Sequence, residues 1–321
     1  MKTLLYRSRP ASPLLLFVAT VAAFGLLSNA ARAQITPQIF VAYNSGNTIG
    51  DYNATTGAAI NPGLIGGVEG PFPIANSPMA IAATPYNLYI ASNNTSNISE
   101  YTLSGAVVNT DLVSGVFGPT GLVVSGPDMF VSNLDSGNIG EYNATTGATI
   151  NASLVTGINA HGIAVSGSDL FVVNSNSISE YNATTGALIN ASLVSGLSNP
   201  TAIVVSGSDL FVTSAGASDS IGVYDATTGA AVNATLVSGL SDPIGLATLK
   251  GNLYVLENGG TSNGTIGEFT TSGATVNAAL VSGLTNVESF AVVPEPATWP
   301  LLAGAAVALL AVFCRRTLKA A

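Results

Sequence analysis

Short apolar runs recur along the middle of the chain at nearly constant spacing. Turn-forming Gly, Asn, Ser and Asp residues separate these runs, and this combination is typical of β-strands. Successive runs start 49, 41, 41, 40 and 43 residues apart. Their first residues are Ile39, Leu88, Met129, Leu170, Leu210 and Leu253. A period near ~40 residues predicts one structural unit repeated six times.

Each unit contains four stretches with strand character. After the run at Met129 comes a second apolar patch over 139–142, followed by the turn Asn143-Ala144-Thr145-Thr146-Gly147. A third stretch resembles 187–196, and a fourth, such as 161–165, closes the unit. An Asn side chain can accept hydrogen bonds from backbone amides further along the turn, and Gly can adopt a positive φ. Four strands every ~41 residues is the period of a β-propeller blade.

The two ends of the repeat array complement each other. The first unit lacks the fourth type of strand ahead of Ile39, whereas the last unit carries a surplus copy over 288–292. If these segments pair, the chain closes a ring and leaves no open sheet edge. We therefore expect an all-β fold in which residues 34–293 form a six-bladed propeller with four-stranded blades. An open β-solenoid is the alternative, although its coils are usually shorter.

The order Gly-Ile-Ala-Val, Leu-Phe-Val and Ile-x-Glu-Tyr resembles the repeats of NHL-type and YVTN-type propellers over about residues 38–293. The likeness lies in the period and the apolar pattern. It implies the propeller fold. Because those families are functionally diverse, it implies no catalytic residue.

Charge is sparse and unevenly distributed. Charged residues make up 8% of the chain, and the formal net charge is −9. Lys250 is the only Lys or Arg between Arg32 and Arg315, while all 17 acidic residues lie between Asp51 and Glu295. A middle segment without a basic patch cannot neutralise phosphates, so nucleic acid is excluded as a partner.

Residues 1–33 have the three zones of a signal peptide. Basic residues at 2, 7 and 9 precede an apolar stretch over 14–27, and Ala31-Arg32-Ala33 provides a small-x-small cleavage site. Cleavage between Ala33 and Gln34 is therefore expected, with an N-terminal signal helix removed. An uncleaved anchor helix is the alternative. The protein is expected to be secreted.

Residues 294–321 form a second processing signal. Pro294, Glu295 and Pro296 are followed by an apolar run over 297–314 and then by Arg315 and Arg316. Eighteen helical residues rise ~27 Å, which is close to the thickness of a bilayer core. The arginines favour a cytoplasmic C-terminus, which would leave the propeller outside. The sequence thus predicts a C-terminal transmembrane helix.

This order of motifs resembles the PEP-CTERM sorting signal over about residues 293–321. In that family an exosortase in the inner membrane recognises and processes the tail. The resemblance implies a Gram-negative bacterium and transient anchoring in the inner membrane with the propeller in the periplasm. It then implies delivery to the cell surface or the extracellular polysaccharide matrix of a biofilm. An ordinary retained anchor is the alternative.

One recurring polar position is a candidate for ligand binding. It is occupied by Asp51, Glu100, Glu141, Glu180 and Glu268, with Val223 breaking the set. Equivalent positions in a closed propeller form a ring, and carboxylates attract Ca²⁺ or a cationic ligand. The ring radius at such a strand is too large for one ion to bridge. The alternative is that each acid lies at a blade edge or accepts hydrogen bonds from backbone donors.

Other candidate chemistry is limited. His161 is the only histidine and precedes an expected inner strand, so it is a candidate for lining the central channel. The one cysteine, Cys314, lies in the tail, which leaves the propeller without a histidine- or cysteine-based metal cluster. Tyr142 and Tyr181 are expected to pack between blades. Sequons such as Asn143-Ala144-Thr145 are best explained as turn chemistry.

The sequence favours a binding or structural module over an enzyme. The expected partners are the exosortase during processing, and then an extracellular polysaccharide or a surface protein. No cofactor is expected, with Ca²⁺ as the one weak candidate. The first alternative is a calcium-dependent lactonase or hydrolase, which would need carboxylates and amides converging in the channel. The second is a structural spacer without a ligand.

Overall fold

The computed structural model describes residues 36–44, 46–66, 78–259 and 263–293. Every regular element in these ranges is a β-strand, and within them no helix is long and apolar enough to span a membrane. The expected signal peptide, its cleavage site, the Pro-Glu-Pro motif, the apolar tail and the terminal arginines lie outside the described residues. Their assignments therefore stay predictions.

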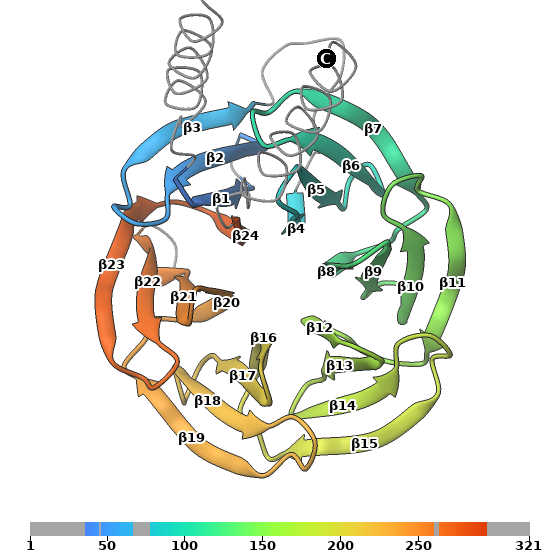
Figure 1. The fold of residues 1–321 in the computed structure, drawn as a ribbon, viewed down its shortest axis with the longest axis vertical. Coiled ribbons are helices and arrows are strands. Elements are labelled where there is room, and N and C mark those ends of the chain that lie inside the picture. The colour runs from blue at the N-terminus through green and yellow to red at the C-terminus, as the bar shows by residue number, and fades with distance from the viewer. Residues whose placement is uncertain (1–35, 45, 67–77, 260–262, 294–321) are drawn as a thin grey trace, which may run out of the picture. The chain divides into compact units, whose positions relative to one another are not determined.

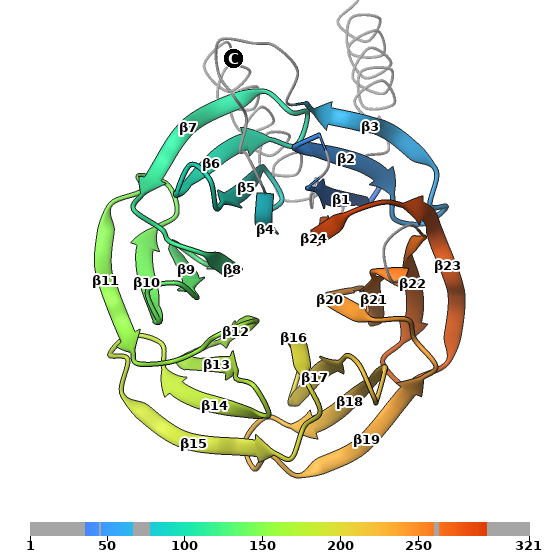
Figure 2. The same ribbon diagram turned by 180° about the vertical axis from the view of Figure 1, so that it is seen from behind.

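The strands of the described residues form six separate four-stranded antiparallel sheets, which are the blades of a ring (Figure 1, and from behind in Figure 2). Within each blade the strands follow one another from the centre of the ring outward. Blade 1 contains β24 (Val287–Val293), β1 (Gln38–Tyr43), β2 (Thr48–Asn53) and β3 (Ala59–Ile65). Blade 2 contains β4 (Pro78–Ala83), β5 (Asn87–Ser92), β6 (Asn97–Thr102) and β7 (Val107–Ser114). Blade 3 contains β8 (Pro119–Ser125), β9 (Asp128–Asn133), β10 (Asn138–Asn143) and β11 (Thr149–Thr156). Blade 4 contains β12 (Ile163–Ser166), β13 (Asp169–Val173), β14 (Ser177–Asn182) and β15 (Leu188–Ser195). Blade 5 contains β16 (Pro200–Ser206), β17 (Asp209–Ser214), β18 (Ser220–Asp225) and β19 (Ala231–Ser238). Blade 6 contains β20 (Pro243–Leu249), β21 (Asn252–Glu257), β22 (Gly264–Thr270) and β23 (Thr275–Leu284).

The ring closes through blade 1, as the sequence predicts. β24 pairs antiparallel with β1, and Val41 lies opposite Phe290. The innermost strand of this blade therefore comes from the C-terminal side of the domain and the other three from its N-terminal side (Figure 1). Because β1 gains this partner, its inner edge is not left open to another chain. The six-bladed, four-stranded propeller is confirmed.

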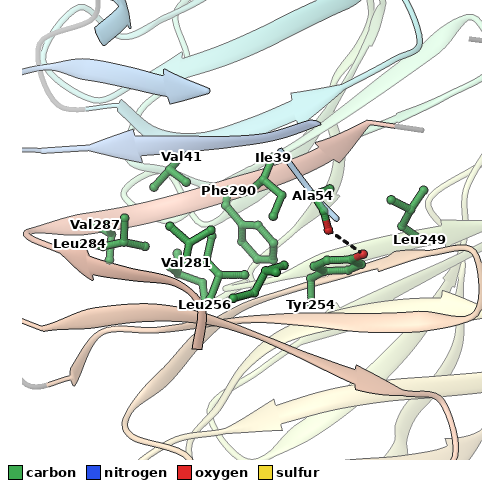
Figure 3. Packing of buried hydrophobic residues seen from close by; sticks show 12 residues of the cluster. Ile39, Val41, Ala54, Leu249, Tyr254, Leu256, Val281, Leu284, Val287 and Phe290 are labelled. Carbon is green, nitrogen blue, oxygen red and sulfur yellow. Dashed lines mark hydrogen bonds between the residues drawn. The ribbon is translucent and has the colours of Figure 1, made fainter. Parts of the chain in front are cut away.

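Apolar clusters between neighbouring blades form the core. Between blades 6 and 1, Tyr254 and Leu256 pack against Ile39, Val41 and Phe290 (Figure 3). The Tyr254 hydroxyl donates a hydrogen bond to the carbonyl oxygen of Ala54 at 3.3 Å. Both faces of each blade are covered by neighbours, so its strands need apolar residues on both sides. This explains continuous runs such as those at Ile39 and Leu253.

A turn glycine brings each blade into contact with the preceding one. Gly147 of blade 3 has φ +69°, and a Cβ placed on it would lie 1.7 Å from the carbonyl oxygen of Leu112 in blade 2. A Cβ placed on Gly57 of blade 1 would lie at the same distance, 1.7 Å, from the carbonyl oxygen of Leu280 in blade 6. Only glycine combines this positive φ with such a close approach of backbone. The glycine of the repeated turn thus sets the spacing between blades.

The outermost strands are irregular at one repeated asparagine. In blade 3 the pairing of β10 with β11 shifts on both sides of Glu141–Asn151, which marks β-bulges. The Asn151 side chain accepts a hydrogen bond from the Ser153 amide at 3.1 Å. Each blade repeats this contact, through Asn61, Asn109, Asn151, Asn190, Asn233 and Asn277. The asparagine side chain therefore provides a hydrogen-bond acceptor for a backbone amide that the bulge removes from strand pairing.

Candidate functional site

The recurring acids lie on the third strand from the centre and face the following blade. Glu141 on β10 is directly opposite Phe130 on β9, and opposite residues of paired strands point to the same side of the sheet. Phe130 packs into the cluster shared with blade 4, together with Leu170 and Ala183. The same geometry holds for Glu268, because its neighbour Tyr254 reaches Ala54 of blade 1. The acids are therefore interface residues.

The recurring acids differ in how far their side chains are buried. Asp51, Glu100, Glu141 and Glu268 are between 2% and 8% exposed, whereas Glu180 is half-buried. Val223 fills the same position in blade 5 and is also buried. Each acid belongs to a different blade interface, so the fold does not bring them together at one ligand. Among the described residues, no group of three or more His, Cys, Asp or Glu side chains is placed to hold a metal ion.

In three blades a side-chain amide donates a hydrogen bond to the buried carboxylate. The first residue of the second strand is Asn87 in blade 2, and its Nδ2 donates to Oε1 of Glu100 at 2.7 Å. Asn252 makes the same 2.7 Å bond to Glu268 in blade 6. In blade 1, Nε2 of Gln38 donates to Oδ2 of Asp51 at 2.8 Å. These amide–carboxylate bonds link the second and third strands inside each interface.

Three blades place an acid where the other three have an amide, and in two of them, blades 3 and 4, the third strand carries a second acid. Asp128 of blade 3 and Asp169 of blade 4 occupy the position of Asn87. Burial raises the pKa of Glu141, and the nearby charge of Asp128 raises it further. Glu180 has a raised pKa for the same two reasons, with Asp169 as the neighbour. The repeat therefore carries two chemically distinct versions of one side-chain pair.

Asp51 is the most strongly perturbed member of the series. Burial raises its pKa to about 6, and the hydrogen bond from Gln38 offsets only part of that rise. Its second oxygen, Oδ1, is buried and has no hydrogen-bond partner among the described residues. Leu103, in the turn between β6 and β7 of blade 2, packs against the adjoining cluster where blades 3 to 5 place alanine. Burial removes water from the carboxylate and disfavours its charged form, which accounts for the shift.

A further carboxyl group, which sequence analysis missed, lies between blades 5 and 6. Glu257, at the end of β21, is 8% exposed and accepts a hydrogen bond from the Ser241 amide at 2.6 Å. Burial raises its pKa, with a smaller contribution from Asp219. Oδ1 of Asp219 is itself buried without a partner among the described residues. The residue has no acidic equivalent in the other repeats, so periodicity gave no signal for it.

His161 lies ahead of the innermost strand of blade 4. Its side chain is half-buried, and its amide donates to the carbonyl oxygen of Val173 at 3.0 Å. Its carbonyl oxygen accepts a bond from the Ser132 hydroxyl of blade 3, also at 3.0 Å. Thr120 of blade 3 reaches the carbonyl of Ala160 in the same way, at 2.9 Å. The backbone around His161 therefore joins two blades.

The expected roles of the tyrosines and the turn asparagines are confirmed. Tyr142 is 4% exposed in the cluster shared by blades 2 and 3, and Tyr181 packs against the cluster between blades 3 and 4. The Asn143 side chain accepts hydrogen bonds from the amides of Thr145 and Thr146, at 3.1 and 2.9 Å. These residues hold the repeat together.

No known family model matches the chain, and no curated protein matches it either. One chain in the crystal structure of a nidogen–laminin complex is similar, with a TM-score of 0.64 and 14% identity over 81% of this chain and 99% of that chain. A protein of unknown function from Bacteroides caccae is also similar, with a TM-score of 0.59 and 14% identity over 81% of this chain and all of the other. At this level of identity the likeness shows the fold alone, and the fold is a six-bladed β-propeller.

Proposed function

We propose that this chain is a secreted, exosortase-sorted protein of the cell surface or extracellular matrix, whose propeller is a non-enzymatic binding or structural module. The observation that carries the proposal is the use of the repeated polar groups. The recurring acids, amides and turn asparagines make contacts within and between blades. Because these polar groups stabilise a scaffold that presents six similar surfaces outward, they favour a binding role over a catalytic one.

The outer strands provide the repeated surface. One β-branched residue stands immediately before the bulge asparagine in every blade, and it is 50% to 64% exposed. These residues are Ile60, Val108, Ile150, Ile189, Val232 and Val276. An apolar side chain beside an exposed amide can contact the ring faces and hydroxyl groups of a sugar. Six copies on one ring favour a polymeric ligand such as a polysaccharide, because linked weak contacts gain avidity.

The address of the protein comes from its terminal segments. The signal-peptide pattern over 1–33 and the Pro-Glu-Pro motif with its apolar tail over 294–321 support export, transient inner-membrane anchoring and exosortase processing. The similarity to a chain from a nidogen–laminin complex supports a binding role by analogy of fold. It supports no particular ligand.

Two experiments test this proposal. The segment 34–293 contains all 24 strands of the described residues, so it can be purified and tested for retention on cells and on matrix polysaccharide of the producing bacterium. Retention that is lost when Ile150 and Ile189 are both changed to Asp supports a binding module. Failure to bind polymer or cells contradicts it, and release of shortened polymer would favour a hydrolase instead. Mass determination of the mature C-terminus in strains with and without exosortase tests the sorting step.

A further inference from the structure

The chain enters and leaves the propeller at one face of the ring. Gln38, the first residue of β1, pairs with Val293, the last residue of β24. The innermost strands of the other blades are equivalent to β24, so the hairpin turns that follow them lie at this face too. The turns between third and fourth strands also lie here, because the Ala144 amide donates to the Pro127 carbonyl oxygen at 2.8 Å. We call this side of the ring the tail face.

Little chain separates the tail face from the expected transmembrane helix. β24 ends at Val293, and the apolar run begins at Ala297. The residues between these two positions span at most ~14 Å when fully extended. The headgroup layer on each side of a bilayer core is itself ~5–8 Å thick. If the run over 297–314 spans the membrane, as proposed above, the end of β24 therefore lies beside the lipid headgroups.

The two halves of the tail face differ in charge. In blades 6, 1 and 2, which follow one another around the ring, the second strand begins with an amide residue (Figure 1). These residues are Asn252, Gln38 and Asn87. In blades 3, 4 and 5 the second strand begins with a half-buried acid. These acids are Asp128, Asp169 and Asp209, and blade 5 adds Asp225 in the turn after its third strand.

The half of the tail face formed by blades 6, 1 and 2 surrounds the exit of the tail. It carries Tyr86, which is 70% exposed in the turn between β4 and β5, and Lys250, which is exposed in the turn between β20 and β21. Tyrosine is enriched at membrane interfaces, and anionic lipids attract lysine. Such a surface repels carboxylates over about one Debye length, ~10 Å at 0.1 M salt. The short link and the charge pattern therefore favour the same half.

We propose that, while the tail anchors the chain, the tail face of blades 6, 1 and 2 lies on the headgroups of a bilayer that contains anionic lipid, and blades 3 to 5 tilt away from it. This inference rests on the membrane anchor of the proposed function. It gives a reason for the amides of blades 6, 1 and 2, because an acid at these positions would face anionic lipid. The opposite face of the ring then points away from the membrane.

The test measures how strongly a lipid with a nitroxide headgroup quenches a fluorophore on the chain 34–321, reconstituted in vesicles of phosphatidylethanolamine and phosphatidylglycerol. Cys314→Ser first removes the only native thiol. The fluorophore is then attached through Ser104→Cys in the outer turn of blade 2, Thr227→Cys in the equivalent turn of blade 5, or Thr95→Cys on the opposite face of blade 2. All three positions are exposed. We expect strong quenching at the first position, weaker quenching at the second and none at the third.

A pair of charge variants tests the contact between the tail face and the lipid. Tyr86→Asp combined with Lys250→Gln makes the half near the tail more acidic and should remove most of the quenching at the blade 2 label. The matched control is Ser168→Asp combined with Ser208→Asp, which changes the net charge by the same amount in the hairpin turns of blades 4 and 5. It should leave that quenching unchanged.

Flotation of the vesicles separates this proposal from the membrane anchor. If the protein floats with the vesicles but is quenched equally at the three positions, or more strongly in blade 5 than in blade 2, the proposed orientation is overturned and the anchor stands. Full quenching in the variant with Tyr86→Asp and Lys250→Gln also overturns the contact. Protein that does not float with the vesicles overturns both the anchor and the orientation.

Discussion

The buried carboxyl group of Asp51 should make the propeller less stable at neutral pH than in mild acid. Its pKa is raised from 3.8 to about 6. The unfolded chain releases the Asp51 proton near pH 4, whereas the folded chain holds it until about pH 6. Between these values the folded state binds more protons, so its stability falls as the pH rises. Two pKa units correspond to about 3 kcal/mol of unfolding free energy.

The substitution Asp51→Asn removes this titration while keeping the shape of the side chain. The new amide can still accept a hydrogen bond from Gln38, although one polar atom stays buried without a partner. We therefore expect a gain smaller than the full linkage energy, about 1–2 kcal/mol at pH 7.5. Below pH 4 both forms of the protein carry a neutral side chain at this position, so the gain should disappear.

The assay is urea unfolding followed by circular dichroism, at intervals from pH 4 to pH 8. The control is Asp111→Asn, which removes the same charge from an exposed position of β7 and should change stability by less than about 0.5 kcal/mol. The quantity of interest is the difference between the Asp51→Asn and unmodified proteins as a function of pH. A difference that stays constant over this range would refute the reasoning, and so would a loss of stability at pH 7.5.

Three further predictions concern the frame. Gly147→Ala should lower the free energy of unfolding by about 3–5 kcal/mol, measured with urea, because the added methyl group meets the Leu112 carbonyl. The control is Gly157→Ala, at a residue with a similar positive φ but open space around it, which should lower that free energy by only about 1–2 kcal/mol. Asn143→Ala should lose about 1 kcal/mol with its three turn hydrogen bonds, whereas Asn143→Asp should retain them, as Asp225 does in blade 5. A chain that ends at Leu284 lacks β24 and should aggregate on size-exclusion chromatography, whereas one that ends at Val293 should stay monodisperse. Equal behaviour within any of these matched pairs would contradict the corresponding contact.

The sequence by itself determined the number of blades and the way the ring closes. Strand character and turn chemistry are local properties, so the ~40-residue period identified the strands around Leu170 and the Asn182 turn without any knowledge of packing. The first unit lacks a strand ahead of Ile39 and the last unit has a surplus strand at 288–292, so pairing the two segments closes the ring. In the structure β24 pairs with β1 in this way.

Only the tertiary structure decided what the repeated polar residues contact. The direction of Glu141 depends on strand register, and its partner Asp128 is 13 positions earlier on a different strand. The close approach of Gly147 to Leu112 joins two different blades, and no local pattern specifies it. A repeated sequence fixes which positions are equivalent, because each unit folds alike. Packing between units then buries Asp51, Glu100 and Glu141 to a similar extent. Their chemistry differs because the side chain beside each acid differs: Gln38, Asn87 and Asp128 respectively.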